Sequence, residues 1–413
     1  MKGVFVIMDG VADQPCNVLN GKTPLEVAKT PNLDEIAKKS KMDYCYTVKE
    51  GLAPESSSAV ISLMGYNEQI PRGILEAVGA GVQLKNGDLA IRTNFATVDD
   101  LDGEILDPRA GRTLTTWEAK ALAKSINEEV KMPFPFEFYA TQQHRGVLVF
   151  RGGFSDNISN ANPYYGNGVA LSKLSYKMTW ATPLDDEDDS KLSAELVNGF
   201  IRKSHEVLKK HPINLARAKK GLYTANVILC RNAGSETIRL KKLRGKWMAL
   251  GYMPLEIGIA KMLKMNVYKF RYPKFRGLDV YSNLYDGLRK AIKNAIRMIK
   301  RYRKRYDYFY VHFKETDIPG HDNKPMDKVK MIEMIDQRFF YFLKRYIGNN
   351  QLIVTADHTT ACRMKGHTAD AVPLLIYPHP KGEINEKRFT EKEGLEGKKW
   401  VGRKVLDGTL FDD

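Results

Sequence analysis

Acidic and imidazole side chains gather in two short C-terminal segments of the 413-residue chain. They are Asp317 and His321 in the first segment, which begins at His312, and Asp357, His358 and His367 in the second. Carboxylate and imidazole groups together, without cysteine, suit Zn²⁺, Mn²⁺ and related divalent ions. Any one of these residues alone would more often be structural. Together with Asp9 they predict a metal site, because so many ligand-type groups are costly to bury unless cations neutralise them.

The surroundings of these residues are turns in our interpretation. Pro319 and Gly320 lie between Asp317 and His321, so we expect a turn after a strand there and not a helix. Asp357 and His358 are neighbours, and within a strand they would point to opposite faces. At the end of a strand the chain turns, and both side chains can then converge.

A second candidate for chemistry is the serine run Ser56, Ser57 and Ser58, which leads into a helix-like segment ending near Tyr66. A serine at a helix start lies at the positive end of the helix dipole, where a phosphoryl group is stabilised. The same pattern is also typical of residues that only cap a helix. The segment by itself leaves both interpretations open.

The elements that must position these groups are short β-branched runs that end in polar residues. The runs are 3–8, 226–230, 308–312 and 351–355, followed by Asp9, Arg231, Lys314 and Asp357 respectively. Helical periodicity is found at about 189–210 and in the apolar positions from 288 to 299. Alternating strands and helices predict a doubly wound α/β core with a mostly parallel sheet and ligands at the carboxyl ends of the strands.

Residues 76–182 have a different pattern, with alternating strand-like segments at 89–98 and 146–150, a helix near 116–130, and a Gly/Asn-rich loop at 152–168. We interpret this region as an inserted α+β cap domain. The predicted domains are therefore a core of 1–75 and 183–413 and an insertion of 76–182.

Composition limits the class of protein. The chain is 43% apolar and 28% charged, which is typical of globular proteins and excludes disordered and fibrous classes. A net charge of +16 favours anionic partners such as phosphorylated metabolites, nucleic acid or a membrane surface. Nine Lys or Arg residues and no acid lie between Arg289 and Arg305, which is more typical of an exposed helix face than of nucleic-acid binding.

The four cysteines, Cys16, Cys45, Cys230 and Cys362, form no CxxC pair, so we expect neither a disulfide framework nor a cysteine-based zinc site. No apolar run approaches the ~18 residues that span a bilayer, and the N-terminal run is too short for a signal peptide. We therefore expect a cytoplasmic protein without a membrane partner.

Several ordered motifs resemble one known family. They are Met8-Asp-Gly-Val-Ala-Asp-Gln-Pro15, Leu19-Asn-Gly-Lys-Thr-Pro-Leu25, Thr30-Pro-Asn-Leu-Asp34, Leu63-Met-Gly-Tyr66, Leu75-Glu-Ala-Val-Gly-Ala-Gly81, Arg92-Thr-Asn-Phe-Ala-Thr97, Arg109-Ala-Gly-Arg112, His144-Arg145, His211-Pro-Ile-Asn214, the segment 312–325, Asp357-His358 and Gly366-His367. This series is similar to the archaeal-type cofactor-independent phosphoglycerate mutases of the alkaline phosphatase superfamily. It spans nearly the whole chain.

The resemblance implies an alkaline phosphatase-like core and a site for two divalent ions, Mn, Zn, Co or Mg, with no bisphosphoglycerate cofactor. Asp9, Ser56, Asp357 and His358 would hold one ion, and Asp317, His321 and His367 the other. In such enzymes a metal-activated serine takes the phosphoryl group of phosphoglycerate and returns it to the other hydroxyl. Counting back from Ala59 and the Leu63-Met-Gly-Tyr66 motif places Ser56 at the position of this nucleophile.

Expected substrate contacts follow from the charge of a phosphoglycerate. By position, the candidates are Arg109, Arg112, His144, Arg145, Arg231 and Lys314.

The chain departs from the family pattern near the substrate. The family has an acid at the place of Ser57 and a polar residue at the place of Val60, and its Asp-x-Asp-Pro-His motif is Asn160-Ala-Asn-Pro-Tyr164 here. Glu55 or Ser57 could substitute for the lost groups. We therefore expect a phosphoglycerate mutase, with a metal-dependent phosphatase or phosphodiesterase as the first alternative and a non-catalytic protein that binds anionic partners as the second.

Overall fold

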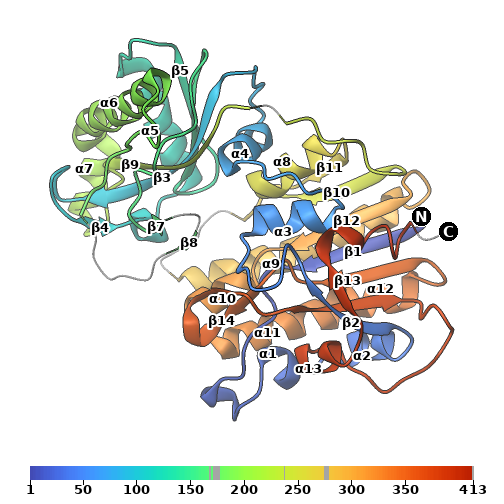
Figure 1. Ribbon diagram of the computed structural model, residues 1–413. Coiled ribbons are helices and arrows are strands. Elements are labelled where there is room, and N and C mark those ends of the chain that lie inside the picture. The colour runs from blue at the N-terminus through green and yellow to red at the C-terminus, as the bar shows by residue number, and fades with distance from the viewer. Residues whose placement is uncertain (167–168, 171–176, 237, 274–278, 412–413) are drawn as a thin grey trace.

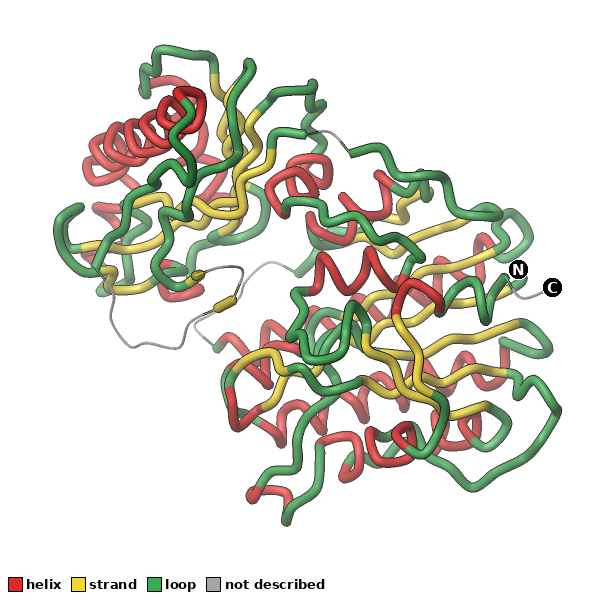
Figure 2. Tube along the Cα trace, in the orientation of Figure 1, coloured by secondary structure: helices red, strands yellow, loops and turns green. Residues whose placement is uncertain are grey.

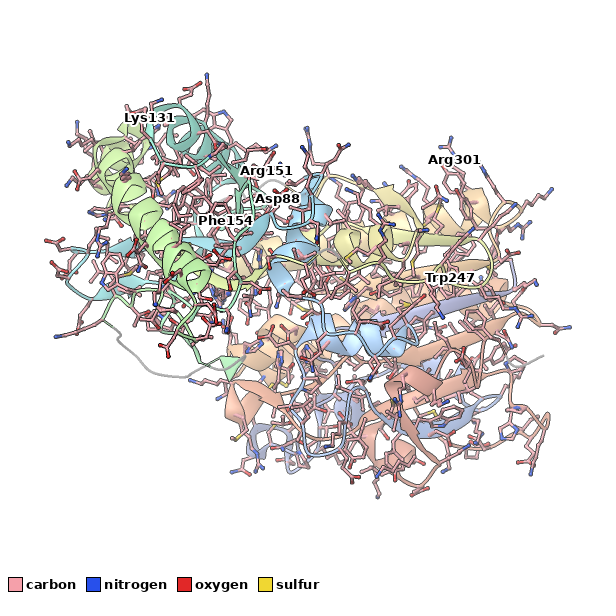
Figure 3. All side chains as sticks on the ribbon, turned by 45° about the horizontal axis from the view of Figure 1, so that its top comes forward. Asp88, Lys131, Arg151, Phe154, Trp247 and Arg301 are labelled. Atoms are coloured by element: carbon pink, nitrogen blue, oxygen red, sulfur yellow. The ribbon has the colours of Figure 1, made fainter. Side chains whose placement is uncertain are left out.

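The computed structural model describes residues 1–413 except 167–168, 171–176, 237, 274–278 and 412–413. The chain forms two lobes (Figure 1), each with its own hydrophobic core. We call residues 88–234 the smaller lobe and the rest the larger lobe. Phe154 belongs to the core of the smaller lobe and Trp247 to that of the larger one, and Figure 3 shows the two side chains far apart.

The larger lobe is built on a sheet of eight strands within the described residues. In spatial order they are β11 (Asn266–Lys269), β10 (Trp247–Gly251), β12 (Tyr308–Phe313), β1 (Gly3–Met8), β13 (Gln351–Thr355), β16 (Val372–Tyr377), β2 (Lys41–Tyr46) and β17 (Lys399–Val401). β16 runs antiparallel to both of its neighbours, and the other described pairings are parallel. The prediction of a mostly parallel α/β sheet is confirmed, and 3–8 and 351–355 coincide with β1 and β13.

Helices cover both faces of this sheet. Helix α8 (Pro254–Met262) leads from β10 outward to β11, whereas α9 (Val280–Tyr302) leads from β11 back to β12. Because right-handed crossovers in opposite directions place their helices on opposite faces, α8 and α9 lie on the two sides of the sheet (Figure 1). The remaining helices of this lobe are α1 (Pro24–Val27), α2 (Pro31–Ala37), α3 (Ser56–Leu63), α4 (Arg72–Ala80), α10 (Asp317–His321), α11 (Pro325–Ile335), α12 (Tyr341–Tyr346) and α13 (Glu391–Leu395).

Helix α9 carries most of the basic segment. Its apolar residues, among them Leu288, Ile292 and Ile299, are buried against the larger core. Arg297 and Arg301 are exposed, and the Arg301 side chain extends from the surface (Figure 3). The interpretation of an exposed basic helix face over an apolar stripe is confirmed.

The smaller lobe has a mainly antiparallel sheet packed against helices. Strand β3 (Leu89–Val98) pairs with β6 (Arg145–Phe150), β9 (Val227–Gly234) and β4 (Ile105–Asp107), and β5 (Phe136–Ala140) pairs with β6. Its helices are α5 (Thr116–Glu129), α6 (Asp188–Lys210) and α7 (Pro212–Lys219), and the short strands β7 (Tyr165–Gly166) and β8 (Val169–Ala170) pair with each other. The loop predicted at 152–168 is largely irregular up to β7, and 167–168 lie outside the described residues.

Two boundaries differ from the sequence prediction. The run 226–230, expected in the parallel core, lies in β9 and pairs antiparallel with β3 in the smaller lobe. Helix α6 also packs in the smaller core, through Leu196, Phe200 and other residues. The packing therefore places the return to the larger lobe after Gly234 and not at 183. A buried apolar run has the same pattern in either kind of sheet, so it does not specify its partner strand.

The start of the insertion, predicted at residue 76, also differs in the structure. Helix α4, which contains the predicted boundary residue Glu76, packs on α8 of the larger lobe. A Cβ on Gly79 would lie 1.9 Å from the Pro254 carbonyl oxygen, and one on Gly258 would lie 1.9 Å from that of Leu75. The two glycines thus let the backbones of α4 and α8 approach closely. Helix α4 also packs against β3, β6 and β9, so it lies between the two lobes, and the first strand of the smaller lobe begins at Leu89.

Among the helices in the described ranges, none combines the length and the apolar character needed to cross a bilayer.

Candidate functional site

The candidate site lies at the carboxyl ends of three neighbouring parallel strands. β12, β1 and β13 are adjacent in the sheet, and Lys314, Asp9 and Asp357 follow their last residues by one or two positions. Figure 2 shows the strands of the larger lobe in yellow, side by side and joined to green loops at their ends. Parallel neighbours bring their carboxyl ends to one edge, so residues more than 300 positions apart in the chain become neighbours there.

The first predicted ligand group converges inside the larger lobe, where Asp9, Ser56, Asp357 and His358 are all buried. Ser56 Oγ lies 3.0 Å from His358 Nε2, and the same nitrogen lies 3.5 Å from Asp9 Oδ1 and 3.4 Å from Asp357 Oδ2. The backbone N–H of Gly10 donates to Asp357 Oδ1 at 3.0 Å. The structure brings these four residues together, and their role as ligands stays a prediction.

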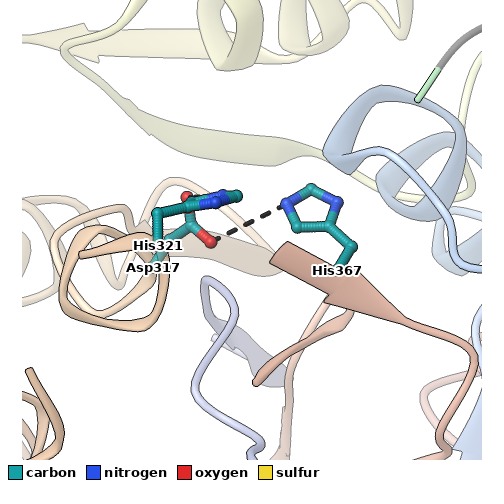
Figure 4. Close-up of side chains that lie close together, drawn as sticks. All are labelled: Asp317, His321 and His367. Carbon is teal, nitrogen blue, oxygen red and sulfur yellow. Dashed lines mark ion pairs between the residues drawn. The ribbon is translucent and has the colours of Figure 1, made fainter. Parts of the chain in front are cut away.

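The second predicted group lies beside the first. His321 Nε2 is 3.4 Å from Asp317 Oδ2, and His367 Nε2 is 3.8 Å from Asp317 Oδ1 (Figure 4). Asp317 and His321 are the ends of helix α10, so the predicted turn is wrong. Proline has no N–H to donate but is tolerated in the first turn of a helix, where that donor has no intrahelical partner.

The two groups adjoin each other. The rings of His358 and His367 stack with their centroids 3.6 Å apart, and ligand atoms of Asp9, Asp317 and His358 lie within 4.8 Å of one another. Burial alone would raise the pKa of Asp317, but His321, His358 and His367 hold it well below its ordinary value. Burial lowers the pKa of His358 far below its usual range, which favours the neutral imidazole that binds metals.

These donors fit divalent cations. Oδ1 of Asp9 and Oδ2 of Asp357 are buried, and neither accepts a hydrogen bond from a described group. A buried carboxylate oxygen without a donor is costly, and a cation would remove that cost. A set of carboxylate, imidazole and hydroxyl groups suits Zn²⁺ or Mn²⁺, and the geometry does not distinguish between these ions.

The serine run starts helix α3, but Ser56 does not cap it. Glu55 is the N-cap residue, and Ser58 Oγ donates to the Glu55 carbonyl oxygen at 3.0 Å. Ser56 is the first residue of the helix, and its hydroxyl faces His358. The capping interpretation is therefore wrong for Ser56. Glu55, considered as a substitute for the lost acid, forms an ion pair with Arg72 at 3.3 Å.

Around Asp9 lie the predicted residue Lys314 and two further residues, His312 and Glu256, that were not among the predicted site residues. His312 Nε2 lies 2.9 Å from Asp9 Oδ2. The ammonium of Lys314 contacts Asp9 and lies 3.1 Å from Glu256 Oε1. Burial opposes the charge of Lys314, but Asp9 and Glu256 raise its pKa above the ordinary value, so it stays a cation. Sequence reasoning missed Glu256 because it lies at the start of α8, distant from every motif in the chain.

An arginine cluster from both lobes lies near the serine. Arg92 and Arg72 each form an ion pair with Glu76 Oε1, at 2.8 and 3.0 Å. Burial alone would raise the pKa of Glu76, but Arg92, Arg72, Arg145 and Arg231 lower it. We define the arginine cluster as Arg72, Arg92, Arg109, Arg145 and Arg231.

Of the predicted substrate residues, Arg109, Arg145 and Arg231 belong to this cluster and His144 lies beside it, whereas Lys314 contacts Asp9. Burial, together with Arg92 and Arg109, lowers the pKa of Arg145 to about 10, although Glu76 opposes this shift. Burial, Arg145, Arg109 and Arg112 hold the pKa of His144 well below its usual range. Sequence reasoning missed Arg72 and Arg92, although Arg92 opens one of the quoted motifs. The excess of cations over acids at this place suits an anionic substrate.

Arg112 links the two lobes. Its Nη1 and Nη2 donate to Asp322 Oδ2 and Oδ1 at 3.0 and 3.2 Å, and Tyr281 Oη donates to Oδ2 at 3.0 Å. Asp322 follows His321, so this two-pronged ion pair joins the smaller lobe to the loop after α10. In this structure Arg112 thus contacts the larger lobe, and its contact with substrate stays a prediction.

The positions that depart from the family pattern lie near the cluster. Asn160 Oδ1 accepts the Asn232 N–H at 2.8 Å, and Ala161 pairs with Cys230, so this segment runs beside Arg231. Asn162 Oδ1 accepts the Tyr164 N–H at 3.2 Å. Val60 is fully buried in the larger core. Asn160 and Asn162 are uncharged, whereas the motif implied by the resemblance has acids at these two positions.

Arg145→Ala and Arg112→Ala are each expected to lower kcat/KM by about tenfold or more, equivalent to about 1.4 kcal/mol, because each removes a guanidinium group near the anion site. Metal content should stay unchanged. Steady-state kinetics and elemental analysis test this, with Lys124→Ala as the control, since Lys124 is an exposed cation of the smaller lobe. Wild-type kinetics in both arginine variants would show that other residues hold the substrate.

Comparisons with known proteins agree with this site. The family model for 2,3-bisphosphoglycerate-independent phosphoglycerate mutase matches residues 37–214. The enzyme of that name from Thermococcus gammatolerans is 37% identical to this chain, and the match covers 96% of this chain and 93% of that enzyme. The enzyme of that name from Aeropyrum pernix is 36% identical, and the match covers 99% of both chains.

Solved structures point the same way. A protein from Pyrococcus horikoshii superposes with a TM-score of 0.74 at 28% identity, covering 99% of this chain and 96% of its own. The cofactor-independent phosphoglycerate mutase from Thermoplasma acidophilum gives a TM-score of 0.58 at 25% identity, covering 100% and 99%. The extent and identity of these matches show that the chain belongs to the family of 2,3-bisphosphoglycerate-independent phosphoglycerate mutases.

Proposed function

We propose that this chain interconverts 2-phosphoglycerate and 3-phosphoglycerate, the reaction of its family, with Ser56 as the group that carries the phosphoryl between the two hydroxyls. The observation that carries the proposal is the position of Ser56. Its hydroxyl starts helix α3 and lies 3.0 Å from His358 Nε2, beside a group of buried carboxylates.

Two divalent ions fit the residues present. Asp9, Ser56, Asp357 and His358 would hold one, and Asp317, His321 and His367 the other. When bound, the ions supply Lewis-acid stabilisation of negative charge on the serine and phosphoryl oxygens. The buried acceptor oxygens of Asp9 and Asp357 support this assignment.

The chain's own groups would bind and orient the substrate. The arginine cluster supplies the positive charge for the carboxylate and phosphate of a phosphoglycerate, and Lys314 supplies a fixed ammonium next to Asp9. The start of α3 presents backbone N–H groups toward the position of Ser56, where a phosphoryl group is stabilised. Ser56 Oγ would lose its proton and bond to phosphorus as the P–O bond to glycerate breaks, and the departing glycerate oxygen would take up a proton. In the return step the other glycerate hydroxyl would lose its proton and bond to phosphorus, and Ser56 Oγ would regain a proton as its P–O bond breaks.

Release of the first hydroxyl and attack by the second require that glycerate turns within the site without leaving it. The Arg112–Asp322 contact between the lobes supports a closed site in which water does not compete as the acceptor. Four buried cysteines without disulfides support a reducing compartment, so we place the reaction in the cytoplasm.

The direct test is to incubate chelator-stripped protein with 3-phosphoglycerate and Mn²⁺, Zn²⁺, Co²⁺ or Mg²⁺ in separate reactions without bisphosphoglycerate. We expect 2-phosphoglycerate to form with no more than traces of inorganic phosphate. Phosphate release without 2-phosphoglycerate would identify a phosphatase, the alternative that the changes at Ser57, Val60, Asn160, Asn162 and Tyr164 favour.

The exposed cations of α9 favour a further alternative, a protein that binds anionic partners. Replacing Arg297, Arg301 and Arg305 by glutamine should leave turnover unchanged if the mutase proposal holds. Lack of turnover in the wild type, together with loss of binding to an anionic polymer in this variant, would favour the binding protein.

A further inference from the structure

We propose that Thr360 is the positioning residue that joins the two candidate metal groups, so that the two ions bind cooperatively. This inference rests on the proposed function for the identity of the ligands. Thr360 lies in the middle of the short strand β14 (Thr359–Ala361), which forms a hairpin with β15 (Gly366–Thr368). No motif argument identified it, because a threonine two residues after His358 has no distinctive chemistry in the sequence.

The hydroxyl of Thr360 bonds to one residue of each group. Its Oγ1 donates to Asp317 Oδ1 at 2.7 Å and lies 3.0 Å from His358 Nδ1. A hydroxyl has one proton, and the Asp317 carboxylate can only accept. The proton of Thr360 therefore points to Asp317, and a lone pair of Oγ1 accepts the N–H of His358 Nδ1.

This arrangement fixes which ring nitrogen of His358 carries the proton. With Nδ1 protonated, Nε2 of the neutral ring presents its lone pair to Ser56 Oγ at 3.0 Å. Asp9 Oδ1 and Asp357 Oδ2 lie 3.5 and 3.4 Å from the same nitrogen and have no donor. Lone pairs from three side chains thus meet at one place, which is unfavourable without a cation and favourable with one.

The rest of Thr360 also connects ligand-bearing segments. Its N–H donates to the Ala12 carbonyl oxygen at 3.0 Å, in the loop after Asp9, and it is the strand partner of His367. The buried ammonium of Lys328 donates to the carbonyl oxygens of Thr360 and Ala12, at 2.8 and 3.2 Å. The backbone of Thr360 is therefore tied to the segments that carry Asp9 and His367.

Two glycines leave room for the Thr360 side chain. A Cβ on Gly10 would lie 2.3 Å from Thr360 Oγ1, and one on Gly320 would lie 2.6 Å from its Cγ2. These glycines are the neighbours of Asp9 and His321. Gly10 has a φ of +53°, which a side chain would also strain. The hydroxyl is thus held in one position between the groups.

Cooperativity follows from the shared hydroxyl. An ion on Asp317 fixes that carboxylate, which keeps the Thr360 proton directed at it and the His358 lone pair directed at the other ion. Loss of the hydroxyl would leave both ligands free to turn. We expect the affinities for the two metal ions to fall together when the Thr360 hydroxyl is removed.

The test uses Thr360→Val, which replaces the hydroxyl by a methyl group of similar size, and Thr360→Ser, which keeps the hydroxyl. Thr359→Val is the matched control, since Thr359 Oγ1 donates to the Asp370 carbonyl oxygen and contacts no candidate ligand through its hydroxyl. Mn²⁺ binding to chelator-stripped protein is measured by calorimetry. We expect Thr360→Val to lower the affinity for both Mn²⁺ ions by roughly ten- to 100-fold and to abolish their cooperative binding. Thr360→Ser and Thr359→Val should bind Mn²⁺ as the wild type does.

A second readout requires no metal. In ¹⁵N-histidine spectra of the metal-free protein, with His358 assigned by substitution, we expect Nδ1 protonated in wild type and Thr360→Ser, and a changed proton position in Thr360→Val. Wild-type Mn²⁺ binding by Thr360→Val, or an Nε2-protonated His358 in the wild type, would overturn the inference. If Thr360→Val does not fold, the spectrum of the wild type still decides. Cooperative binding without mutase activity would instead refute only the proposed function.

Discussion

Replacement of Ser56 by alanine is expected to lower kcat by a factor on the order of 10³ or more, because the reaction loses the oxygen that accepts the phosphoryl group. Ser58→Ala is the matched control. Its hydroxyl bonds to the Glu55 carbonyl oxygen in the first turn of α3, and its loss should leave kcat within about twofold of wild type. Steady-state assay of 2-phosphoglycerate formation measures both variants.

The same assignment predicts where a label will be found. Rapid acid quench of the wild type with ³²P-phosphoglycerate, followed by peptide mapping, should place phosphate on Ser56. Successive helical residues are rotated by about 100°, so Ser57 and Ser58 cannot present their oxygens to His358 in the way Ser56 does. Label on Ser57 or Ser58, or full activity of Ser56→Ala, would show that another group carries the phosphoryl or that transfer is direct.

The second large effect is expected for the residues of the second metal group. Asp317→Ala, His321→Ala and His367→Ala should each reduce bound metal below two ions per chain and abolish turnover, because each removes one of three neighbouring donors. Elemental analysis after exhaustive dialysis measures the metal. Unchanged metal content in all three variants would contradict a site for two ions.

His379→Ala provides the control for this series. His379 Nε2 lies 3.7 Å from Glu383 Oε2, a histidine–acid pair of the same spacing as Asp317 and His321. It follows β16, which runs antiparallel to β13 and therefore ends at the sheet edge opposite the candidate site. Its loss should leave metal content and turnover unchanged.

Metal binding to this group should also depend on pH. Asp317 raises the pKa of His321 to about 9 in the metal-free protein, so below that pH an ion must displace the proton of His321. The affinity for the second ion is therefore expected to rise with pH up to about 9 and then to level off. Calorimetry in buffers of different ionisation enthalpy would detect the released proton, and a pH-independent affinity would contradict the assignment of His321.

Much of the local structure could be predicted from the sequence because it depends on neighbouring residues. The runs 3–8, 351–355 and 89–98 are strands β1, β13 and β3 with the predicted bounds, and the helices near 116–130 and 189–210 are α5 and α6 within a residue or two. Apolar periodicity, together with the residues typical of strand and helix ends, predicts such elements directly. The ligand types of Asp317, His321 and His367 and the family motifs are likewise present in the chain itself.

Only the tertiary structure decided which distant elements meet. The run 226–230 has the apolar pattern of a core strand but pairs with β3, since pairing is selected by the whole sheet. Arg72 and Glu256 enter the site from helices that carry no motif at these positions, and the motif that contains Arg92 did not reveal its pairing with Glu76. The link from Thr360 to Asp317 and His358 depends on atoms 2.7 and 3.0 Å apart. Such contacts arise from packing between segments far apart in the chain, so the spacing of residues in the sequence does not predict them.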